Sequence, residues 1–497
     1  MAVVLDGKSL TCAEVIAVAV RGEPVSIDPT AREWVKRAAD LAQEVTGRRP
    51  VYGRTTGVGA NRMVSVEEQE VAAFGRRLLR SHAGGTGPLI PETEARAMMI
   101  VRANQILAGH SGVSEHVLDA VVLALNARCY PQVHSIGAIG TGDLTALAEL
   151  ALTLLGEQPW MGPHPLPPID FATSDALAFL SSNALTIGQA VLASGQLSAL
   201  LDQTCTTAAL SLLAVDGSVE PFAEVVHQSR PHHGSQLVAR RIRDLLGEIT
   251  HTPARVQDPF GLRCFPQVHG EAADGLLALE QVLTVEINAG AENPLVSVLD
   301  GDVFHHGGFH SITLSLALDK ARLSALQTAQ LSVSRLAMLC EPNYTGLRPF
   351  AADEASGSSG LMVIEYTAAA SLASFRSMAM PAVLGHATLS RGVEEHASFS
   401  AQSARMTGEV VPHFVIVLAC ELIASARVLR MRQMHPNNSV ELRAAFDNAV
   451  AVLPTETVDR PLTVDLMTAS ALLTGEHLEM PDQLRRVTDK RVKDKPA

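Results

Sequence analysis

Two glycine-rich stretches hold the residues whose types and spacing best suit chemistry. Residues 135–144 read SIGAIGTGDL, with three glycines followed by Asp143 at the start of an expected helix. Residues 52–59 read YGRTTGVG and carry Tyr52, one of only four tyrosines in the chain. The phenol of Tyr52 is a candidate general base, although a lone tyrosine is more often structural. Taken singly, the first stretch also fits a flexible loop with an N-cap aspartate, and the second a simple turn.

Further motifs follow in an order that carries a family resemblance. Asn183 precedes QDPFGLRC at residues 257–264 and ENPLV at residues 292–296. Shorter supporting stretches are SHAGG at 81–85, LAGHSG at 107–112, GEQPW at 156–160, RPHHGSQ at 230–236 and GGFH at 307–310. From about Tyr52 to His396, the chain resembles the histidine/aromatic amino-acid ammonia-lyase family. Its length is similar to that of the bacterial histidine ammonia-lyase branch.

The resemblance implies an electrophile that the chain makes from itself. In the family, an Ala-Ser-Gly tripeptide cyclises to a methylidene-imidazolone. Such an electron sink is needed because the β-proton of an amino acid is barely acidic and its ammonium is a poor leaving group. The matching tripeptide is Gly140-Thr141-Gly142, called the Gly-Thr-Gly loop below, and Asp143 stands where the family keeps an acid. No dissociable cofactor and no metal is implied.

Thr141 is the first departure from the family pattern. Dehydration of a threonine yields an ethylidene group, whose extra methyl crowds the carbon that must accept the amine. The stretch GAIGTGDL also reads one residue shorter than the family's GSVGASGDL. Three alternatives are open: the ring forms poorly, the ring reacts more slowly, or the loop keeps the fold without the ring.

Two further departures concern the substrate pocket. Phe260 stands where the family motif QDxYxLR has tyrosine, which keeps the packing and loses a hydroxyl. Ser374 stands where histidine ammonia-lyases tend to carry a glutamate, so the sequence predicts that a carboxylate is missing. Glu365 either compensates for it or is a buried carboxylate paired with an arginine.

At other positions the sequence has the site residues that the resemblance implies. Tyr52 is expected to remove the β-proton, which at neutral pH requires a depressed pKa near a positive group. Arg263 is expected to bind the substrate carboxylate as a fork, or else to form a structural ion pair. Asn183 is expected to orient the carboxylate or the ring carbonyl, with Asn293 as its neighbour. Either amide alternatively caps a helix.

Histidine side chains bear on two questions: which substrate the protein binds, and whether it holds a metal ion. The pair Ser81-His82 matches the selectivity dyad of the histidine enzymes in the family, and His82 can hydrogen-bond an imidazole. Histidine is therefore the first expected substrate. The pairs at 232–233 and 305–306 lack a third ligand with suitable spacing, so we interpret them as structural.

Two hypotheses of function follow. The first is an ammonia-lyase that acts on an aromatic amino acid, most directly histidine to urocanate; a 2,3-aminomutase is its close variant. The second is a non-catalytic or repurposed homologue that binds a ligand or uses the old pocket without the ring. By analogy with the family, the assembly is a homotetramer whose pockets are completed by loops of three subunits.

Long helices are expected to position these loops. Apolar periodicity predicts helices at 65–81, 94–108, 115–127, 143–155, 174–213, 270–286, 307–338, 360–380 and 402–431. The first 60 residues indicate short elements with many breakers, and residues 489–497 a frayed tail. We therefore predict an all-α fold. Residues 1–190 would form an N-terminal helical lobe with the tyrosine and Gly-Thr-Gly loops, and 191–497 a long central helix bundle with C-terminal helices, as one continuous subunit fold.

Composition excludes several classes of protein. The 497 residues are 47% hydrophobic, 18% charged and 4% aromatic, with a net charge of −13. Such an apolar chain is not intrinsically disordered, and an acidic chain without a basic tract does not suit nucleic acid. The run at 176–201 is interrupted by amides and serines, so it fits a buried helix better than a membrane span. Six scattered cysteines without a CxxC pair favour a reduced, cytoplasmic protein.

Overall fold

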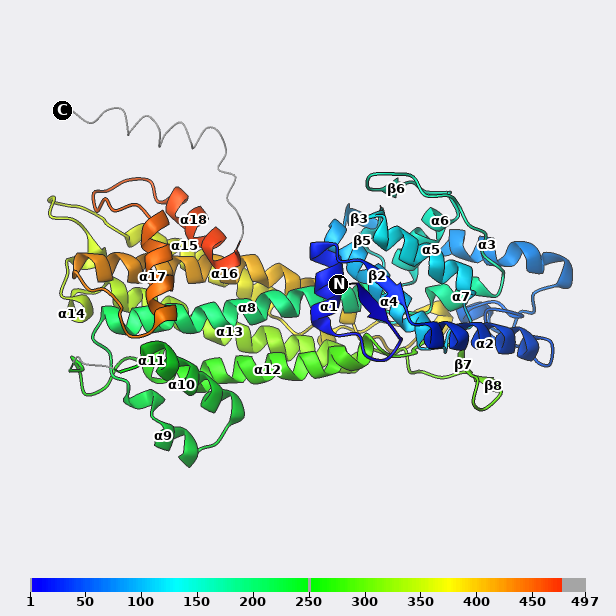
Figure 1. Ribbon diagram of the computed structural model, residues 1–497, viewed down its shortest axis with the longest axis horizontal. Coiled ribbons are helices and arrows are strands. Elements are labelled where there is room, and N and C mark those ends of the chain that lie inside the picture. The colour runs from blue at the N-terminus through cyan, green and yellow to red at the C-terminus, as the bar shows by residue number, and fades with distance from the viewer. Residues whose placement is uncertain (1, 249–251, 476–497) are drawn as a thin grey trace. The chain divides into compact units, whose positions relative to one another are not determined.

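The computed structural model of the chain describes residues 2–248 and 252–475, and Figure 1 shows its helices and strands. The chain divides into two compact units. The first unit contains the chain up to residue 195 together with 277–320 and 380–408, and the second contains 196–276, 321–379 and the chain from 409 on. The tail expected at 489–497 lies outside the described residues. The first unit thus takes up two segments that the sequence analysis had placed in the bundle.

The first unit combines medium-length helices with short strand pairs. Its helices are α1 (Cys12–Arg21), α2 (Pro29–Thr46), α3 (Val71–His82), α4 (Glu92–Leu107), α5 (Glu115–Asn126), α6 (Leu144–Leu154) and α7 (Asp175–Leu180). Its strands are β1 (Val3–Leu5), β2 (Val25–Ile27), β3 (Thr86–Leu89), β4 (Tyr130–Pro131), β5 (His134–Ile136), β6 (Trp160–Met161), β7 (Leu295–Ser297) and β8 (Asp302–Phe304). They form four two-stranded sheets, β1-β2 parallel and β3-β5, β4-β6 and β7-β8 antiparallel. Single 3₁₀ turns lie at 59–61, 68–70, 382–384 and 390–392.

Local sequence explains where the first helices begin. Thr11 and Glu14 form a capping box, in which the Thr11 hydroxyl accepts from the Glu14 N–H and the Glu14 carboxylate accepts from the Thr11 N–H. Asp28 caps α2 by accepting from the Ala31 N–H, and Pro29 occupies the first helical position. The 18-residue α2 then packs its apolar face on the β7-β8 hairpin through a small buried cluster. This contact fixes the hairpin that leads toward the site described below.

Helix α4 is the centre of the first unit, because it is buried from Ala95 to Leu107. Its Arg102 is fully buried and donates to two main-chain carbonyls in the last turn of α7, at 3.1 and 2.6 Å. The same guanidinium forms an ion pair with buried Glu292 at 2.8 Å. Removing one member of such a buried pair is strongly destabilising. Arg102 therefore fixes both the end of α7 and the start of the 292–310 segment.

The second unit is built on long helices. Four long helices pass through a boundary between the units: α8 (Ala184–Ala214), α12 (Phe265–Glu286), α13 (Ile312–Cys340) and α16 (Ser400–Met431). The others in this unit are α9 (Glu224–Ser229), α10 (His233–Leu246), α11 (Phe260–Arg263), α14 (Pro342–Thr345), α15 (Met362–Met378), α17 (Val440–Val452) and α18 (Thr463–Thr474). Single 3₁₀ turns lie at 220–222 and 349–351. One large apolar core connects the helices of this unit.

A buried polar network crosses the core of the second unit. Arg335 of α13 pairs with Glu421 of α16 through two hydrogen bonds, at 2.6 and 2.8 Å, and both side chains are fully buried. Ser211 of α8 and Ser332 of α13 donate to the same carboxylate, at 2.7 and 2.6 Å. Every oxygen of the buried carboxylate is thus paired, which a buried charge requires. The network fixes the register of three long helices.

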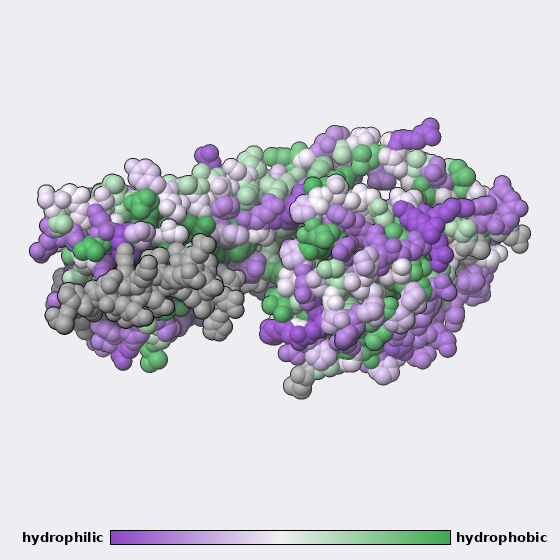
Figure 2. All heavy atoms as spheres, turned by 90° about the horizontal axis from the view of Figure 1, so that it is seen from above, coloured by the Kyte–Doolittle hydropathy of each residue, from purple (hydrophilic) through white to green (hydrophobic). Residues whose placement is uncertain are grey.

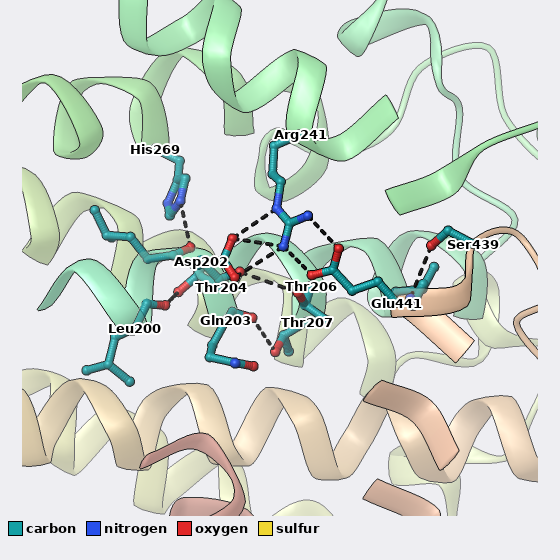
Figure 3. A network of polar contacts seen from close by, with 12 residues as sticks. Leu200, Asp202, Gln203, Thr204, Thr206, Thr207, Arg241, His269, Ser439 and Glu441 are labelled. Atoms are coloured by element: carbon teal, nitrogen blue, oxygen red, sulfur yellow. Dashed lines mark hydrogen bonds and ion pairs between the residues drawn. The ribbon is translucent and has the colours of Figure 1, made fainter. Parts of the chain in front are cut away.

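A second network ties shorter helices to α8 (Figure 3). Arg241 of α10 donates to both carboxylate oxygens of Asp202 on α8, at 2.9 and 3.1 Å, and also pairs with Glu441 of α17. Ser439 caps α17 by accepting from the Leu442 N–H. The guanidinium therefore joins α8, α10 and α17 at one point.

The prediction of an all-α fold with long helices is confirmed. All but one of the expected helices are present as single helices, with ends that differ by up to six residues. Two differences matter. The first 60 residues include the long helix α2, and the expected 174–213 helix breaks into α7 and α8 at Ser181, Ser182 and Asn183.

By length and composition alone, the apolar segment at 175–214 could cross a membrane. Within its most apolar window, 83% of the residues are buried inside the structure. That burial is typical of a core helix, as the sequence predicted. On the face seen in Figure 2, hydrophobic residues are interspersed with hydrophilic ones.

Candidate functional site

The first unit contains a cavity of about 660 Å³. Five segments of the chain line it: the Tyr52 loop at 50–63, the Gly-Thr-Gly loop and its continuation at 141–144, residues 177–182, residues 293–310 and residues 393–396. Because 277–320 and 380–408 belong to the first unit, the whole wall comes from one unit. Of the site residues expected from the sequence, Tyr52, Thr141, Gly142 and Asn293 line this cavity.

Tyr52 follows α2 and lies on the cavity wall. Its phenol oxygen accepts a hydrogen bond from the Gly59 N–H at 2.7 Å, and its main-chain N–H donates to His305 Nε2 at 3.2 Å. Burial, and then the charge of Glu394, raise the pKa of the phenol, while the Gly59 N–H and Arg62 lower it. The net shift is upward, so the depressed pKa expected for a base at neutral pH is not found.

Close backbone contacts hold the tyrosine loop. Gly53 has φ +70°, and a Cβ there would overlap Leu177 of α7. At the other end, the Ser390 hydroxyl accepts from the Ala60 N–H at 2.8 Å, and a Cβ on Gly59 would approach the same hydroxyl. Only glycine suits such positions without strain. The loop is therefore held between α7 and the 390–392 turn.

The Gly-Thr-Gly loop meets the start of α8 on its Gly142 side. The Gly142 N–H donates to Asn183 Oδ1 at 3.1 Å, and Asn183 Nδ2 donates to the Phe309 carbonyl at 2.8 Å. The second bond fixes the orientation of the amide, because a carbonyl can only accept. Buried Asn183 does not line the cavity itself; it positions the loop.

Asp143 is buried behind the loop and is not on the cavity wall. Its carboxylate accepts from the N–H and the hydroxyl of Thr186 in the first turn of α8, at 2.8 and 2.9 Å. Burial raises the pKa of Asp143 to about 6, against the hydrogen bonds from Thr186, which lower it. The expected acid next to the tripeptide thus anchors the loop to a helix N-terminus, where a negative charge is favourable.

On the Gly140 side the loop contacts the start of α16. The Ser398 hydroxyl donates to the Gly140 carbonyl at 2.8 Å, and the Phe399 N–H donates to the Ile139 carbonyl at 2.8 Å. Gly140 has φ +84°, and a Cβ there would overlap the Ser398 hydroxyl. Gly142 has φ +119° and space around its Cα.

These residues fit an imidazolone formed from the tripeptide. Both glycines have the conformational freedom that ring closure needs. The carbonyl of the first residue and the N–H of the third each have one hydrogen-bond partner, and Thr141 lies on the cavity wall. The shortened loop therefore still presents its threonine to the cavity.

Another part of the cavity wall carries amide and imidazole groups. Asn293 donates its main-chain N–H to the Ser181 hydroxyl at 2.9 Å, and its Oδ1 accepts from the His306 N–H at 3.0 Å. His310 Nε2 and His396 Nδ1 lie 3.0 Å apart, and both rings line the cavity.

Two carboxylates line the cavity, which the sequence analysis had not found. Glu394 and Glu395 lie there, and Glu394 is half-buried. The expectation that a carboxylate is missing at Ser374 stays a prediction, because Glu394 and Glu395 belong to a different segment of the chain. The available signal was the acidic pair followed by His396 in a chain with few charges.

Phe260 and Arg263 lie together in the second unit and are not among the residues of the cavity wall. The guanidinium stacks over the Phe260 ring at 4.8 Å and donates to Gln257 Oε1 at 3.0 Å, while its buried Nε has no hydrogen-bond partner in the described part of the chain. The Phe260 side chain is 63% exposed. Among the described residues no acidic side chain forms an ion pair with Arg263, so its guanidinium is available to bind a carboxylate.

Glu365 lies on α15 of the second unit and is half-buried. Its pKa is raised by burial and by the charge of Glu341, against a hydrogen bond with Cys340 that lowers it. Its carboxylate therefore has a thiol and another acid as neighbours, and the arginine pairing considered from the sequence is not among its interactions.

His82 ends α3 and lies off the cavity wall. Its Nδ1 lies 2.8 Å from the Leu78 carbonyl and 3.2 Å from the Ser81 hydroxyl, so the dyad is satisfied within its own helix turn. Within residues 2–248 and 252–475, no group of three or more His, Cys, Asp or Glu is placed to hold a metal ion.

Comparisons with known proteins agree with this geometry. A model of the family described as aromatic amino acid lyase matches residues 10–451. The chain is 36% identical to a histidine ammonia-lyase of Sorangium cellulosum, over 94% of this chain and 96% of that protein. Its structure is similar to that of histidine ammonia-lyase from Trypanosoma cruzi, with a TM-score of 0.88, 26% identity, and coverage of 96% and 94%. It is also similar to tyrosine aminomutase from Streptomyces globisporus, with a TM-score of 0.90, 25% identity, and coverage of 98% and 99%. The chain belongs to the aromatic amino acid lyase family, the carbon–nitrogen lyases that its motifs indicated.

Proposed function

We propose that the protein is a histidine ammonia-lyase, which converts histidine to urocanate and ammonia. The observation that carries this proposal is that Tyr52, Thr141 and Glu394 line one cavity although they are far apart in the chain. The histidine ammonia-lyase of Sorangium cellulosum, at 36% identity over nearly the whole chain, supports histidine over other aromatic amino acids.

An imidazolone made from the Gly-Thr-Gly loop supplies, once formed, the electrophile that makes the amino group a leaving group. Ser398 and Asn183 hold the two ends of that loop, and Asp143 anchors it to α8. The side chain at Thr141 faces the same cavity as the phenol of Tyr52.

The chain's own side chains account for proton transfer and binding. Tyr52 Oη takes the β-proton, and the Gly59 N–H stabilises the phenolate that does so. Half-buried Glu394 accepts the imidazole N–H of the substrate, the role that the sequence analysis gave to His82. The neighbouring rings of His310 and His396 can bind the remaining imidazole nitrogen.

Arg263 binds the substrate carboxylate from a neighbouring subunit of a homotetramer. Two observations support this assignment: its Nε is buried without a partner, and Phe260 beside it is largely exposed. Other apolar side chains of the second unit are exposed as well, such as Val363 at 55% and Tyr366 at 70%. Exposed apolar groups of this size are typical of interfaces. All six cysteines are free, which suits a cytoplasmic protein.

The test combines the mass of the intact protein with product analysis. The purified protein is expected to be lighter than its sequence by two water molecules and to release urocanate and ammonia from histidine. An unmodified mass would remove the electrophile, and release of ammonia from tyrosine or phenylalanine alone would remove the histidine assignment.

A 2,3-aminomutase is the second candidate, favoured by the likeness to the Streptomyces globisporus enzyme. It predicts β-histidine without free ammonia in the same incubation. The ratio of ammonia to β-amino acid therefore distinguishes the two reactions.

A further inference from the structure

Four residues around the start of α16 bind the carbonyl groups of the loop before Thr141. Ser398 donates to the carbonyl of Gly140, and the next residue's N–H donates to that of Ile139, each at 2.8 Å. Further along, Gln402 Nε2 donates to the Ala138 carbonyl at 2.7 Å, and Arg405 donates to the Ser135 carbonyl at 3.0 Å. Of these donors, only Ser398 reaches a carbonyl of the tripeptide itself.

The hydrogen-bond pattern assigns the proton of Ser398. Its oxygen accepts from the Ser400 N–H at 3.3 Å and lies 3.1 Å from the Ser400 hydroxyl. Because the Gly140 carbonyl can only accept, the single hydrogen of the Ser398 hydroxyl goes to that carbonyl, and the Ser400 hydroxyl donates to Ser398. Ser398 and Ser400 are both fully buried. A hydrogen bond shielded from water is electrostatically stronger than an exposed one.

We propose that Ser398 is the group that activates the Gly140 carbonyl for closure of the imidazolone ring; this rests on the proposed function. Closure forms a bond between the Gly142 nitrogen and the Gly140 carbonyl carbon, so negative charge develops on the carbonyl oxygen. A preorganised donor at that oxygen stabilises the charge as it develops. The Ser398 hydroxyl is already there, at 2.8 Å.

Formation of the imidazolone consists of two dehydrations and needs no oxidant. The Gly140 carbonyl oxygen leaves as water with the amide hydrogens of Gly142 and Thr141, which creates a C=N bond between Gly140 and Thr141. The Thr141 hydroxyl leaves with the hydrogen of its own Cα as the second water, which creates the ethylidene group. Asn183 Oδ1 orients the Gly142 N–H at the nucleophilic end, at 3.1 Å.

A packing role for Ser398 is the competing explanation. Its hydroxyl occupies the space where a Cβ on Gly140 would lie, so the serine also fills the gap beside a glycine. Cysteine is close in size to serine and its S–H is only a weak donor. The change S398C therefore keeps the packing and weakens the donor, whereas S398A removes both.

The experiment follows ring closure over time. Wild type, S398A, S398C and S425A are made in a cell-free translation reaction, and intact mass gives the fraction of chains that have lost two waters at each time. We expect S398A and S398C to close roughly 10²-fold more slowly, the effect of removing one oxyanion donor. S425A removes a buried serine hydroxyl of α16 that donates to the Leu422 carbonyl, so it should close at the wild-type rate.

Each outcome has a distinct meaning. Closure of S398C at the wild-type rate would overturn the activating role of Ser398 and leave the proposed function intact. A wild-type protein that never loses water would overturn both. Should S398A fail to fold, judged by circular dichroism, S398C alone decides, because it is nearly isosteric with wild type.

Discussion

The Gly59 N–H donates a hydrogen bond to Tyr52 Oη at 2.7 Å, so the two ends of one glycine-rich loop meet at the phenol. A main-chain donor stabilises the phenolate without adding a mobile charge. It partly opposes the burial that raises the pKa of Tyr52. The loop thus both presents the base and moderates its basicity.

Tyr52→Phe is expected to lower kcat/KM for histidine by roughly 10²- to 10⁴-fold, the usual effect of removing a general base. The ring closure should be unaffected, because the hydrogen bonds of Tyr52 in the described structure go to Gly59 and His305 and not to the Gly-Thr-Gly loop. Steady-state kinetics and intact mass test both statements. Tyr130→Phe, on β4 and off the cavity wall, is the matched control. Full activity in Tyr52→Phe would remove Tyr52 as the base.

The activity should rise with pH into the alkaline range. Tyr52 acts as a base only when deprotonated, and its pKa is raised by burial and by Glu394, so the active fraction grows as pH increases. Arg62 lowers that pKa, so Arg62→Met should move the rising limb of kcat/KM to higher pH. Arg48→Met, which only breaks an exposed pair with Glu44, should leave the limb in place. An unmoved limb in Arg62→Met would argue against Tyr52 as the titrating group.

Glu394→Gln should change both binding and pH dependence. Loss of a hydrogen bond to a charged group costs about 1.5–3 kcal/mol, so kcat/KM for histidine should fall roughly 10- to 10²-fold. Removal of the negative charge should also lower the pKa of Tyr52 and move the rising limb to lower pH. Glu395→Gln, at the exposed neighbour, should have smaller effects on both. Equal effects of the two changes would contradict the assignment of Glu394.

Gly53→Ala should destabilise the tyrosine loop. The left-handed φ of +70° costs an alanine about 1–2 kcal/mol, and overlap with Leu177 adds a packing cost of about 1–3 kcal/mol. Thermal unfolding at a fixed protein concentration should show a lower midpoint, with activity reduced as well. In the double variant Gly53→Ala/Leu177→Ala, only the part of the lost stability that comes from the overlap with Leu177 should be recovered. Gly84→Ala, where a Cβ meets nothing within 4 Å, should be neutral.

His269 should make the protein less stable in acid. Burial and the charge of Arg335 lower its pKa to about 3, and its ring contacts Thr328 and the Leu201 carbonyl. The unfolded chain, with a histidine pKa near 6.5, binds a proton that the folded state does not. Stability is therefore lost as pH falls from about 6.5 toward 3, at up to about 1.4 kcal/mol per pH unit. In His269→Gln the free energy of unfolding should fall less steeply as the pH is lowered over this range. An unchanged slope would show that His269 is not the cause of the acid sensitivity.

Much of the fold could be predicted because each long helix carries its own apolar pattern. Helix α5, expected at 115–127, begins and ends within a residue of that range. Helix α2 was missed because its exposed face is charged and breakers surround it, although Asp28 and Pro29 gave a start signal. The break between α7 and α8 was missed because Ser181 to Asn183 interrupt an otherwise apolar run only briefly.

Site residues could be predicted from the sequence only where all the residues of a motif lie close together along the chain. The tyrosine and Gly-Thr-Gly loops each lie within a few residues, so their patterns identified Tyr52 and Thr141. The wall formed by His310, Glu394 and His396 depends on segments that return to the first unit, and no periodicity predicts such a meeting. Arg263 shows the same limit of sequence reasoning. It is expected to bind a substrate carboxylate in the pocket of a neighbouring subunit, and a single chain does not contain that pocket.

The hydrogen bond between Ser398 and Gly140 joins positions 258 residues apart. A ribosome that adds 5–20 residues each second needs roughly ten seconds to a minute to make the intervening chain. During that interval the Gly-Thr-Gly loop lacks its carbonyl donors from α16. Ring closure should therefore stay slow until synthesis has passed Ser398, and a chain truncated before Ser398 should lose its two waters only slowly.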